Sequence, residues 1–453
     1  LMRTNIPAFR LPASVLNDEI NMILEMGVDL RLDHRVDSMQ ALLKEDFDAV
    51  FVGTGAPRGK ELELPGRHDS DRIHIGIDWL ESVAFEHTDS IGEKVLIIGV
   101  GNTAMDCCRT SLRLGGRDVK VMARKPRGHF KASAWELEDA EEEQVEIVVN
   151  HSPREFVIED GKLVGMRFDH LEYSEDSAGN LESKVIGEEF LPCDDVILAI
   201  GQENAFEWIE RDIGITFDEW NVPVIDKTTH QSTLDGVFFG GDAAFGPENI
   251  IWAVEHGHQA AISIHRYCAS QSLNDRMPVG MNLASTKMSI HEWSFSNDFD
   301  PSVRRQMKHV DLQKRFDELN IEVELGFSSE QAAIEIQRCL NCDIQTVFNE
   351  KLCIECDACI DVCPVLCLTI TENGEEAELR QRLTAPAENK DQAIFVSKGL
   401  PQTGRVMVKD EDLCVHCSLC AERCPTGAWD MRKSTLLIPY AIDEEAAWAR
   451  KAG

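Results

Sequence analysis

Residues 94–106 read KVLIIGVGNTAMD, and this stretch decides the fold of the chain. An apolar run leads straight into Gly99 and Gly101, the next residues have the amphipathic pattern of a helix, and a second apolar strand follows at 118–123. Together they form a βαβ unit with a G-x-G-x-x-A pattern whose third small position is Ala104. We therefore predict a dinucleotide-binding turn, with a pyrophosphate at the helix N-terminus. A plain glycine turn is the alternative.

Two basic residues, Arg124 and Lys125, follow the second strand of this unit. An acidic residue near this place binds the ribose 2′-hydroxyl of NAD, whereas a basic residue accommodates the 2′-phosphate of NADP. We therefore expect the protein to prefer NADP(H). The alternative is that both side chains are solvated surface cations.

Small residues also end three other apolar runs. Thr54 and Gly55 follow the run 49–53, and Gly201 ends another buried-type strand. Such residues let the backbone approach a ligand closely. Gly241 and Asp242 end the third run, and the Asp242 carboxylate is placed to accept hydrogen bonds from the ribitol hydroxyls of a flavin. As a helix cap the same aspartate would be equally plausible.

Eight of the fifteen cysteines form two copies of the pattern C-x2-C-x2-C-x3-C-P. This is the spacing of bacterial ferredoxins, in which the fourth cysteine of each run ligates the cluster of the other run. We expect two [4Fe-4S] clusters; zinc knuckles or disulfides are the alternative. One cluster would be held by Cys353, Cys356, Cys359 and Cys424, and the other by Cys414, Cys417, Cys420 and Cys363.

The composition excludes several classes of function. The 453 residues include 80 acidic and 45 basic ones, a formal net charge of −35, which disfavours binding to nucleic acid or to anionic membranes. No run of about 18 apolar residues is present, so we expect no membrane span. Clusters need free thiolates, which favours a reducing compartment, and we expect the cytoplasm.

Taken in order, several segments resemble the small subunit of glutamate synthase and its relatives, which are FAD-containing oxidoreductases of the pyridine nucleotide-disulfide reductase type. The resemblance covers about residues 1–342, and the ferredoxin-type runs cover the rest. The matching segments are IP at 6–7 with FRLP at 9–12, TGA at 54–56 with LPG at 64–66, 99–106, AIGQ at 199–202, and GGD at 240–242 with GP at 246–247.

The resemblance implies an α/β fold with two interleaved Rossmann-like nucleotide-binding domains, the first incomplete, joined to a small α+β ferredoxin-like domain. It implies that the start of a helix at Asn249 and Ile250 approaches the flavin pyrimidine with its positive end. Asp242 would bind the FAD ribitol. The residues implied to hold the NADP pyrophosphate are Gly99, Gly101, Asn102 and Thr103.

Three features depart from the family pattern. The relatives have an N-terminal region with cluster cysteines and an FAD-binding G-x-G-x-x-G loop, so we expect this sequence to be part of a longer chain. Cys107 and Cys108 are adjacent on a helix, so we interpret them as packing residues and not as a redox pair. Three further cysteines could hold part of an additional iron–sulfur centre, or form a thiol pair without metal: Cys339, Cys342 and Cys367.

The expected domains follow from these motifs. They are a partial FAD-binding domain (1–92), an NAD(P)-binding domain (93–200), the C-terminal part of the FAD-binding domain (201–270), a linker (271–335), the ferredoxin-like domain (336–433) and a tail (434–453).

We therefore expect an NAD(P)H:acceptor oxidoreductase in which FAD converts hydride transfer into one-electron transfer to the clusters. Hydride transfer requires no general acid or base, so we expect no separate catalytic residue. The expected partner, in a hetero-oligomer, is a ferredoxin, a 2-oxoacid:ferredoxin oxidoreductase or a large subunit of the glutamate synthase type. The alternatives are a glutamate synthase small subunit proper and a non-enzymatic iron–sulfur relay subunit.

Overall fold

The computed structural model describes residues 1–438 apart from 176–180, 277–279, 299 and 384–393. The chain divides into two compact units, and each is described by itself. The nucleotide-binding unit comprises Leu1–Asp275 and Lys308–Leu325. The iron–sulfur unit comprises the described residues of Arg276–Met307 and of 326–438.

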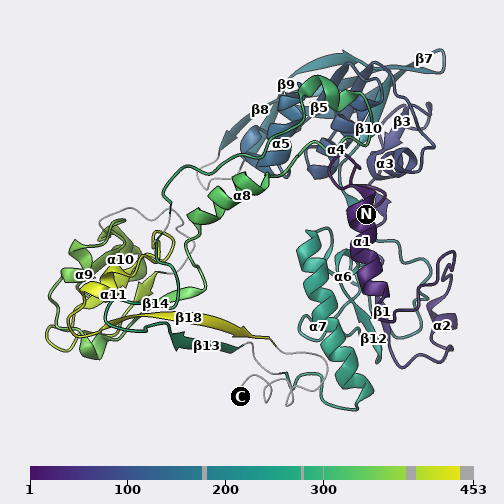
Figure 1. The fold of residues 1–453 in the computed structure, drawn as a ribbon. Helices are drawn as coiled ribbons and strands as arrows, with labels where there is room; N and C mark the ends of the chain where they lie inside the picture. Colours follow the sequence, from purple (N-terminus) through teal and green to yellow (C-terminus); the bar gives the residue numbers. More distant parts are fainter. Residues whose placement is uncertain (176–180, 277–279, 299, 384–393, 439–453) are drawn as a thin grey trace. The chain divides into compact units, whose positions relative to one another are not determined.

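A parallel five-stranded sheet forms the centre of the nucleotide-binding unit, with the order β3-β10-β4-β5-β6 (Figure 1). The four central residues of β4, Val95 to Ile98, are all buried, as is typical of a parallel strand covered on both faces. The strands are β3 (Ile73–Ile75), β4 (Lys94–Ile98), β5 (Asp118–Met122), β6 (Glu146–Val148) and β10 (Asp195–Leu198).

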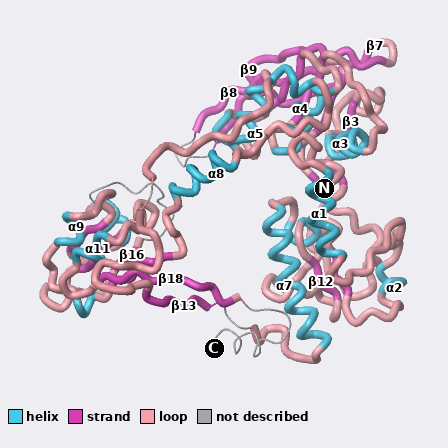
Figure 2. The backbone as a smooth tube through the Cα atoms, viewed as in Figure 1, coloured by secondary structure: helices cyan, strands magenta, loops and turns pink. Residues whose placement is uncertain are grey.

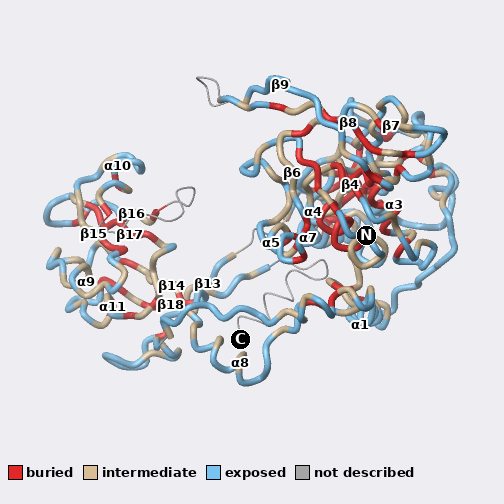
Figure 3. Tube along the Cα trace, turned by 90° about the horizontal axis from the view of Figure 1, so that it is seen from above, coloured by how far each residue is buried: buried red, intermediate tan, exposed pale blue. Residues whose placement is uncertain are grey.

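The two faces of this sheet are covered differently. Val95 and Ile97 pack in one cluster with the helices α3 (Gly76–Ala84) and α4 (Asn102–Arg113), and Ala140 of α5 joins the same cluster. Leu96 and Ile98 pack on the other side against an antiparallel sheet. Figure 3 shows this buried interior in red and the exposed edge strand β9 in pale blue. The remaining elements are α5 (Ala134–Glu142), β7 (His151–Glu159), β8 (Lys162–Glu175) and β9 (Leu181–Pro192).

A second layer of the same unit is built from segments far apart in the sequence. Strand β1 (Val50–Val52) pairs in parallel with β12 (Val237–Phe239), so Val52 lies opposite Phe239. The 19-residue helix α7 (Ile250–Cys268) follows. Because parallel strands end at the same edge of a sheet, the turn after β1 and the turn after β12 lie close together. Shorter elements of this unit are α1 (Ala13–Leu24), α2 (Met39–Leu42), β2 (Arg58–Gly59), β11 (Gln202–Glu203) and α6 (Asp242–Phe245).

In its described residues, the iron–sulfur unit contains two three-stranded antiparallel sheets and four short α-helices. Figure 2 shows its strands in magenta and its helices in cyan. One sheet has the order β13-β18-β14 and the other β15-β17-β16. A single apolar cluster containing Leu368, Met407 and Trp429 packs against the cysteine loops. The elements are β13 (Gly280–Ser285), α8 (Ser329–Glu335), β14 (Ile344–Phe348), α9 (Ala358–Asp361), β15 (Leu368–Thr371), α10 (Glu376–Gln381), β16 (Phe395–Val396), β17 (Val406–Lys409), α11 (Leu419–Arg423) and β18 (Trp429–Leu437).

Two expected boundaries need correction. The stretch 271–335, which we expected to be a linker, contains strand β13 and also the segment 308–325, which belongs to the nucleotide-binding unit. The reason is pairing at long range: β13 pairs with β18, and Arg315 bonds to Glu142 of α5. The expected tail at 434–453 begins inside β18, which extends to Leu437; residues 439–453 lie outside the described part.

The expected fold class is confirmed: nucleotide-binding α/β layers are joined to a ferredoxin-like α+β part. Among the described helices, none combines the length and the apolar character needed to cross a bilayer.

Candidate functional sites

The turn between β4 and α4 has the geometry that the glycine pattern predicts. Gly99 has φ +121°, and a Cβ atom on it would lie 2.2 Å from the carbonyl oxygen of Ala199. Gly101 is the N-cap of α4 and has open space where its Cβ would lie, so the fold itself does not demand glycine there. Ala104, in the first turn of α4, is fully buried. A small residue at Gly101 therefore fits the close approach of a ligand.

Asn102 and Thr103 form the first turn of α4, where amide N–H groups and the positive end of the helix dipole favour an anion. The Asn102 side chain is engaged elsewhere. Its Oδ1 accepts the backbone N–H of Ser133 at 2.9 Å, which fixes the start of α5 beside the turn. The side chain of Asn102 thus shapes the site, while its backbone faces the place predicted for the pyrophosphate.

Arg124 and Lys125 are exposed and follow β5 directly. The backbone carbonyl of Arg124 accepts the hydroxyl of Tyr173 at 2.8 Å, which anchors the loop. Within the described part of the chain, neither side chain has a carboxylate within 4 Å, in contrast to Arg127, which pairs with Glu141. The two cations therefore remain available for a phosphate group.

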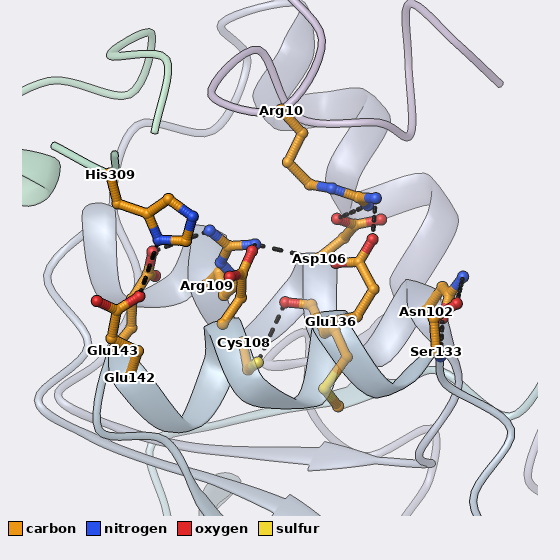
Figure 4. A network of polar contacts seen from close by, with 12 residues as sticks. Arg10, Asn102, Asp106, Cys108, Arg109, Ser133, Glu136, Glu142, Glu143 and His309 are labelled. Carbon is orange, nitrogen blue, oxygen red and sulfur yellow. Dashed lines mark hydrogen bonds and ion pairs between the residues drawn. The ribbon is translucent and has the colours of Figure 1, made fainter. Parts of the chain in front are cut away.

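A charge network that the sequence analysis missed surrounds α4 (Figure 4). Arg109 is 1% exposed and bonds to Asp139 at 2.9 Å and to Glu143 at 3.0 Å. The Glu143 carboxylate also accepts two hydrogen bonds from the Arg113 guanidinium, at 2.7 and 2.9 Å. The sequence signal for this network is the acidic helix at 134–142, which lies opposite arginines spaced four residues apart on α4.

Arg10 extends the network to the N-terminal segment, because it bonds to Asp106 at 2.6 Å and also to Glu136. Burial raises the pKa of Asp106 to about 7, although the Arg10 charge acts in the opposite direction. For Glu143, burial also acts to raise the pKa, but the arginine hydrogen bonds and charges outweigh it and hold the pKa below its ordinary value. Helix α4, which follows the glycine turn, is therefore held in place by buried ionisable groups on both of its sides.

A cavity of about 440 Å³ lies where the turns after β1 and β12 meet. It is lined by six residues that we predicted to bind a cofactor: Thr54, Gly55, Gly241, Asp242, Asn249 and Ile250. Gly201 does not line it, but its neighbour Gln202 does. The three residues expected at the flavin, Asp242, Asn249 and Ile250, thus lie at one cavity with the small residues of two turns.

The cavity wall is held by polar contacts. With its side-chain amide turned so that the nitrogen faces the two carbonyl oxygens, Asn204 donates to Gly55 and Asp242, both at 3.1 Å, and so links the two turns. The Asp242 carboxylate accepts the N–H of Glu248 at 3.2 Å, and partial burial raises its pKa. Asn249 caps α7 by accepting the N–H of Trp252 at 3.1 Å. The positive end of a long helix and the carboxylate therefore border one cavity.

The eight cysteines of the ferredoxin-type runs line two separate cavities in the iron–sulfur unit. The structure brings together the same four thiols for each cavity as cross-ligation between the runs requires. The Cys414 set is Cys414, Cys417, Cys420 and Cys363. The Cys353 set is Cys353, Cys356, Cys359 and Cys424.

Cys367 belongs to the surroundings of the Cys414 set. Its thiol is buried and lies 3.6 Å from the thiol of Cys363. A hydrogen bond from Cys367 is the main cause that lowers the pKa of Cys414, and His416 and the Lys409 charge act in the same direction. The pKa of Cys353, by contrast, is raised, mainly by burial.

Cys339 and Cys342 are exposed and line neither cavity. Between them, the carbonyl oxygens of Leu340 and Asn341 accept hydrogen bonds from His416 Nδ1 at 3.0 and 3.2 Å. The three cysteines considered for an additional centre are thus divided, because Cys367 lies at the cavity of the Cys414 set.

The interpretation of Cys107 and Cys108 as packing residues agrees with the structure. Both are fully buried in the core around α4, and burial raises the pKa of each thiol. The Cys108 thiol bonds to the carbonyl oxygen of Met105 at 3.1 Å.

Comparison with known proteins identifies the two parts. Residues 12–257, more than half of the chain, match the family described as pyridine nucleotide-disulphide oxidoreductase. Residues 352–428 match the 4Fe-4S dicluster domain. Among solved structures, FprA from Mycobacterium tuberculosis (His57Gln mutant) has 16% identity and a TM-score of 0.50, covering 60% of this chain and 75% of that one. That likeness concerns the fold alone.

Curated relatives include three named subunits. The NADPH-Fe(3+) oxidoreductase subunit beta of Geobacter sulfurreducens is 32% identical and covers 76% of this chain and 55% of its own. The NADP(+)-dependent formate dehydrogenase subunit beta of Moorella thermoacetica is 31% identical (76% and 49%). The glutamate synthase [NADPH] small chain of Azospirillum brasilense is 30% identical (60% and 60%). This chain thus spans about half the length of these relatives. It belongs to the pyridine nucleotide-disulphide oxidoreductase family and carries, in addition, a 4Fe-4S dicluster domain.

Proposed function

We propose that the chain is part of an NADPH-dependent flavin and iron–sulfur oxidoreductase subunit, which exchanges electrons with a ferredoxin or with a partner enzyme. The observation that carries this proposal is that the eight thiols of the two runs separate into two sets of four, each at its own cavity, in a chain that also has an open dinucleotide turn. The names of the relatives, which include NADPH and NADP(+), support the same function.

In this proposal the turn at Gly99 and Gly101 and the first amides of α4, at Asn102 and Thr103, hold the pyrophosphate of NADP. Arg124 and Lys125 bind the 2′-phosphate, since charge-assisted hydrogen bonds to phosphate are the strong ones. The open space at Gly101 and the absence of competing carboxylates around the two cations are the features that fit this ligand.

The cavity at Gly55 and Gly241 fits an elongated flavin. Asp242 would accept hydrogen bonds from the ribitol chain, and the start of α7 would place its positive end near the ring. When bound, the flavin supplies the conversion between two-electron hydride transfer and one-electron transfer. The residues of this chain position the cofactor and exclude water, and none of them needs to move a proton.

The two thiol sets fit [4Fe-4S] clusters, because each set offers four cysteine ligands. The position of Cys339 and Cys342 outside both cavities leaves an additional centre without a complete ligand set. We propose that two clusters are the full complement of the described residues.

The substrate chemistry of a whole enzyme would lie in a partner subunit. The relatives are named as subunits of an NADPH-Fe(3+) oxidoreductase, a formate dehydrogenase and a glutamate synthase. A 2-oxoacid:ferredoxin oxidoreductase and a large subunit of the glutamate synthase type are the partners that we propose.

Anaerobic addition of NADPH to the natively purified full-length protein tests the proposal. We expect the flavin absorbance to bleach, the cluster signals in the EPR spectrum to appear, and iron analysis to give at least the eight atoms that the two thiol sets would hold. A protein with this iron content but neither flavin nor NADPH-dependent reduction would instead be a relay subunit, and the proposed activity would be wrong.

A further inference from the structure

The two cavities of the iron–sulfur unit are built from residues that correspond one to one. Lys409 stands five residues before the first cysteine of its run, Cys414, and Phe348 stands five residues before Cys353. Each lines the cavity of its own run. The duplicated motif therefore places a cation at one cavity and an aromatic ring at the equivalent place of the other.

At two further pairs of equivalent positions, the residue at the Cys414 set again favours a negatively charged cluster more than its counterpart at the Cys353 set. Four residues after the last cysteine of each run, Cys367 lines the cavity of the Cys414 set and Ala428 lines that of the Cys353 set. Directly after the second cysteine, the first cavity has Ser418 where the other has Asp357. One cavity thus gains a cation and a thiol donor, and the other gains a carboxylate.

The charge of Lys409 lies deep in the unit. The residue is 1% exposed, and its Nζ bonds to Glu411 Oε2 at 2.6 Å. Glu411 is the partner on the solvent side, with 30% of its side chain exposed. The neighbouring Asp410 is also buried, but it does not line the cavity. Its Oδ1 accepts the N–H of Asp412 at 3.0 Å, and its Oδ2 has no hydrogen-bond partner among the described residues.

A buried charge acts more strongly on its surroundings than an exposed one, because water and salt screen it less. The cation therefore outweighs its partly exposed partner at the cavity of the Cys414 set. Among the described residues, no carboxylate lines that cavity, whereas Asp357 lines the other.

Reduction of an iron–sulfur cluster adds one negative charge. A nearby buried cation and hydrogen bonds to the sulfurs stabilise the reduced form, and a carboxylate destabilises it. All three differences have the same sign, and the buried Lys409 contributes most, because Asp357 is exposed and its charge is screened.

We propose that Lys409 is a positioning residue for electron transfer, which makes the cluster of the Cys414 set the one of higher reduction potential. This inference rests on the cluster ligation proposed above, and it means that a single electron shared by the two clusters resides at the Cys414 set. The cluster of the Cys353 set gives up one electron, the other cluster accepts it, and no bond or proton is exchanged.

The test compares Lys409→Met with its matched control Phe348→Met, which places the same residue at the equivalent position of the other cavity without changing charge. Redox titration of the full-length holoprotein, followed by EPR, measures the potential of each cluster. For Lys409→Met, we expect the reduced-to-oxidised ratio of the higher-potential cluster to fall about tenfold at fixed potential, equal to about 59 mV for one electron. The other cluster should change less than about twofold.

Further variants test whether the reduction potential can be shifted in the opposite direction and which cluster Lys409 affects. Glu411→Gln removes the counter-charge and should raise the potential of the same cluster, whereas Lys409→Arg should preserve it. Cys367→Ala should lower the potential of that cluster, and Phe348→Met should leave it unchanged.

An unchanged potential in Lys409→Met, or an equal shift of both clusters, would overturn the inference while eight irons remained bound. If Lys409→Met failed to assemble its clusters, an unchanged or lowered potential in Glu411→Gln would overturn it. Iron content well below eight in the wild-type protein would instead contradict the cluster ligation of the proposed function.

Discussion

A Cβ atom on Gly99 would lie 2.2 Å from the carbonyl oxygen of Ala199, so the end of β4 can pass the end of β10 only as glycine. Gly101, two residues further on, faces open space. The two glycines of one motif are therefore required for different reasons, the first by the fold and the second by the proposed ligand.

This difference predicts opposite phenotypes for two alanine substitutions. Gly99→Ala should destabilise the protein by about 2 kcal/mol or more, because it combines a clash with a positive φ. Gly101→Ala should keep the melting temperature but weaken NADPH binding about tenfold, equal to about 1.4 kcal/mol. Thermal denaturation and NADPH titration measure the two effects. Equal loss of stability in both variants would contradict the ligand role of Gly101.

Arg124→Ser should weaken NADPH binding roughly 10- to 100-fold, because a charged hydrogen bond to phosphate contributes about 1.5–3 kcal/mol. NADH binding should be unchanged, since NADH lacks the 2′-phosphate. Arg127→Ser is the matched control: it removes a cation three residues away that is paired with Glu141. If both variants weakened NADPH binding equally, only the general positive charge would matter.

The buried carboxyl of Asp106 predicts a pH dependence of stability. Its pKa is raised to about 7 in the folded state from the ordinary value of 3.8, so the folded protein binds the proton more tightly than the unfolded chain. This contribution to stability is fully present below pH 3.8 and is lost as the pH rises through about 7. Between pH 8 and pH 6 it should grow by about 1 kcal/mol.

Comparison of the wild type with Asp106→Asn isolates this effect. The difference between their apparent melting temperatures should shift in favour of the wild type as the pH falls from 8 to 6, because the amide does not titrate. A difference that is constant over this range would show that Arg10 keeps Asp106 ionised.

The double variant Cys339→Ser/Cys342→Ser should retain the iron content of the wild type, since both thiols are exposed and line neither cavity. Cys420→Ser, a change within the Cys414 set, is the comparison, and should lose iron or convert one cluster. Iron and sulfide analysis with EPR distinguishes them. Loss of a whole cluster in the double variant would indicate an additional centre.

Much of the architecture was predictable because it is encoded in short spacings. The strand, turn and helix around Gly99 are neighbours in the sequence, and so are the first three cysteines of each run. Two of the predicted cofactor turns, Thr54–Gly55 and Gly241–Asp242, also meet at one cavity, because each follows a strand and parallel strands end at a common edge.

The sequence by itself therefore determined the βαβ turn, the two cysteine runs and the class of cofactors. Only the tertiary structure decided how residues far apart combine. It returned 308–325 to the nucleotide-binding unit, placed Arg10 and Arg109 among the carboxylates of α5, and paired β13 with β18. It also made Lys409 the buried cation of one cavity and Phe348 the ring of the other. The physical reason is that spacing fixes local geometry, whereas burial and the electrostatic surroundings depend on which distant segments pack together.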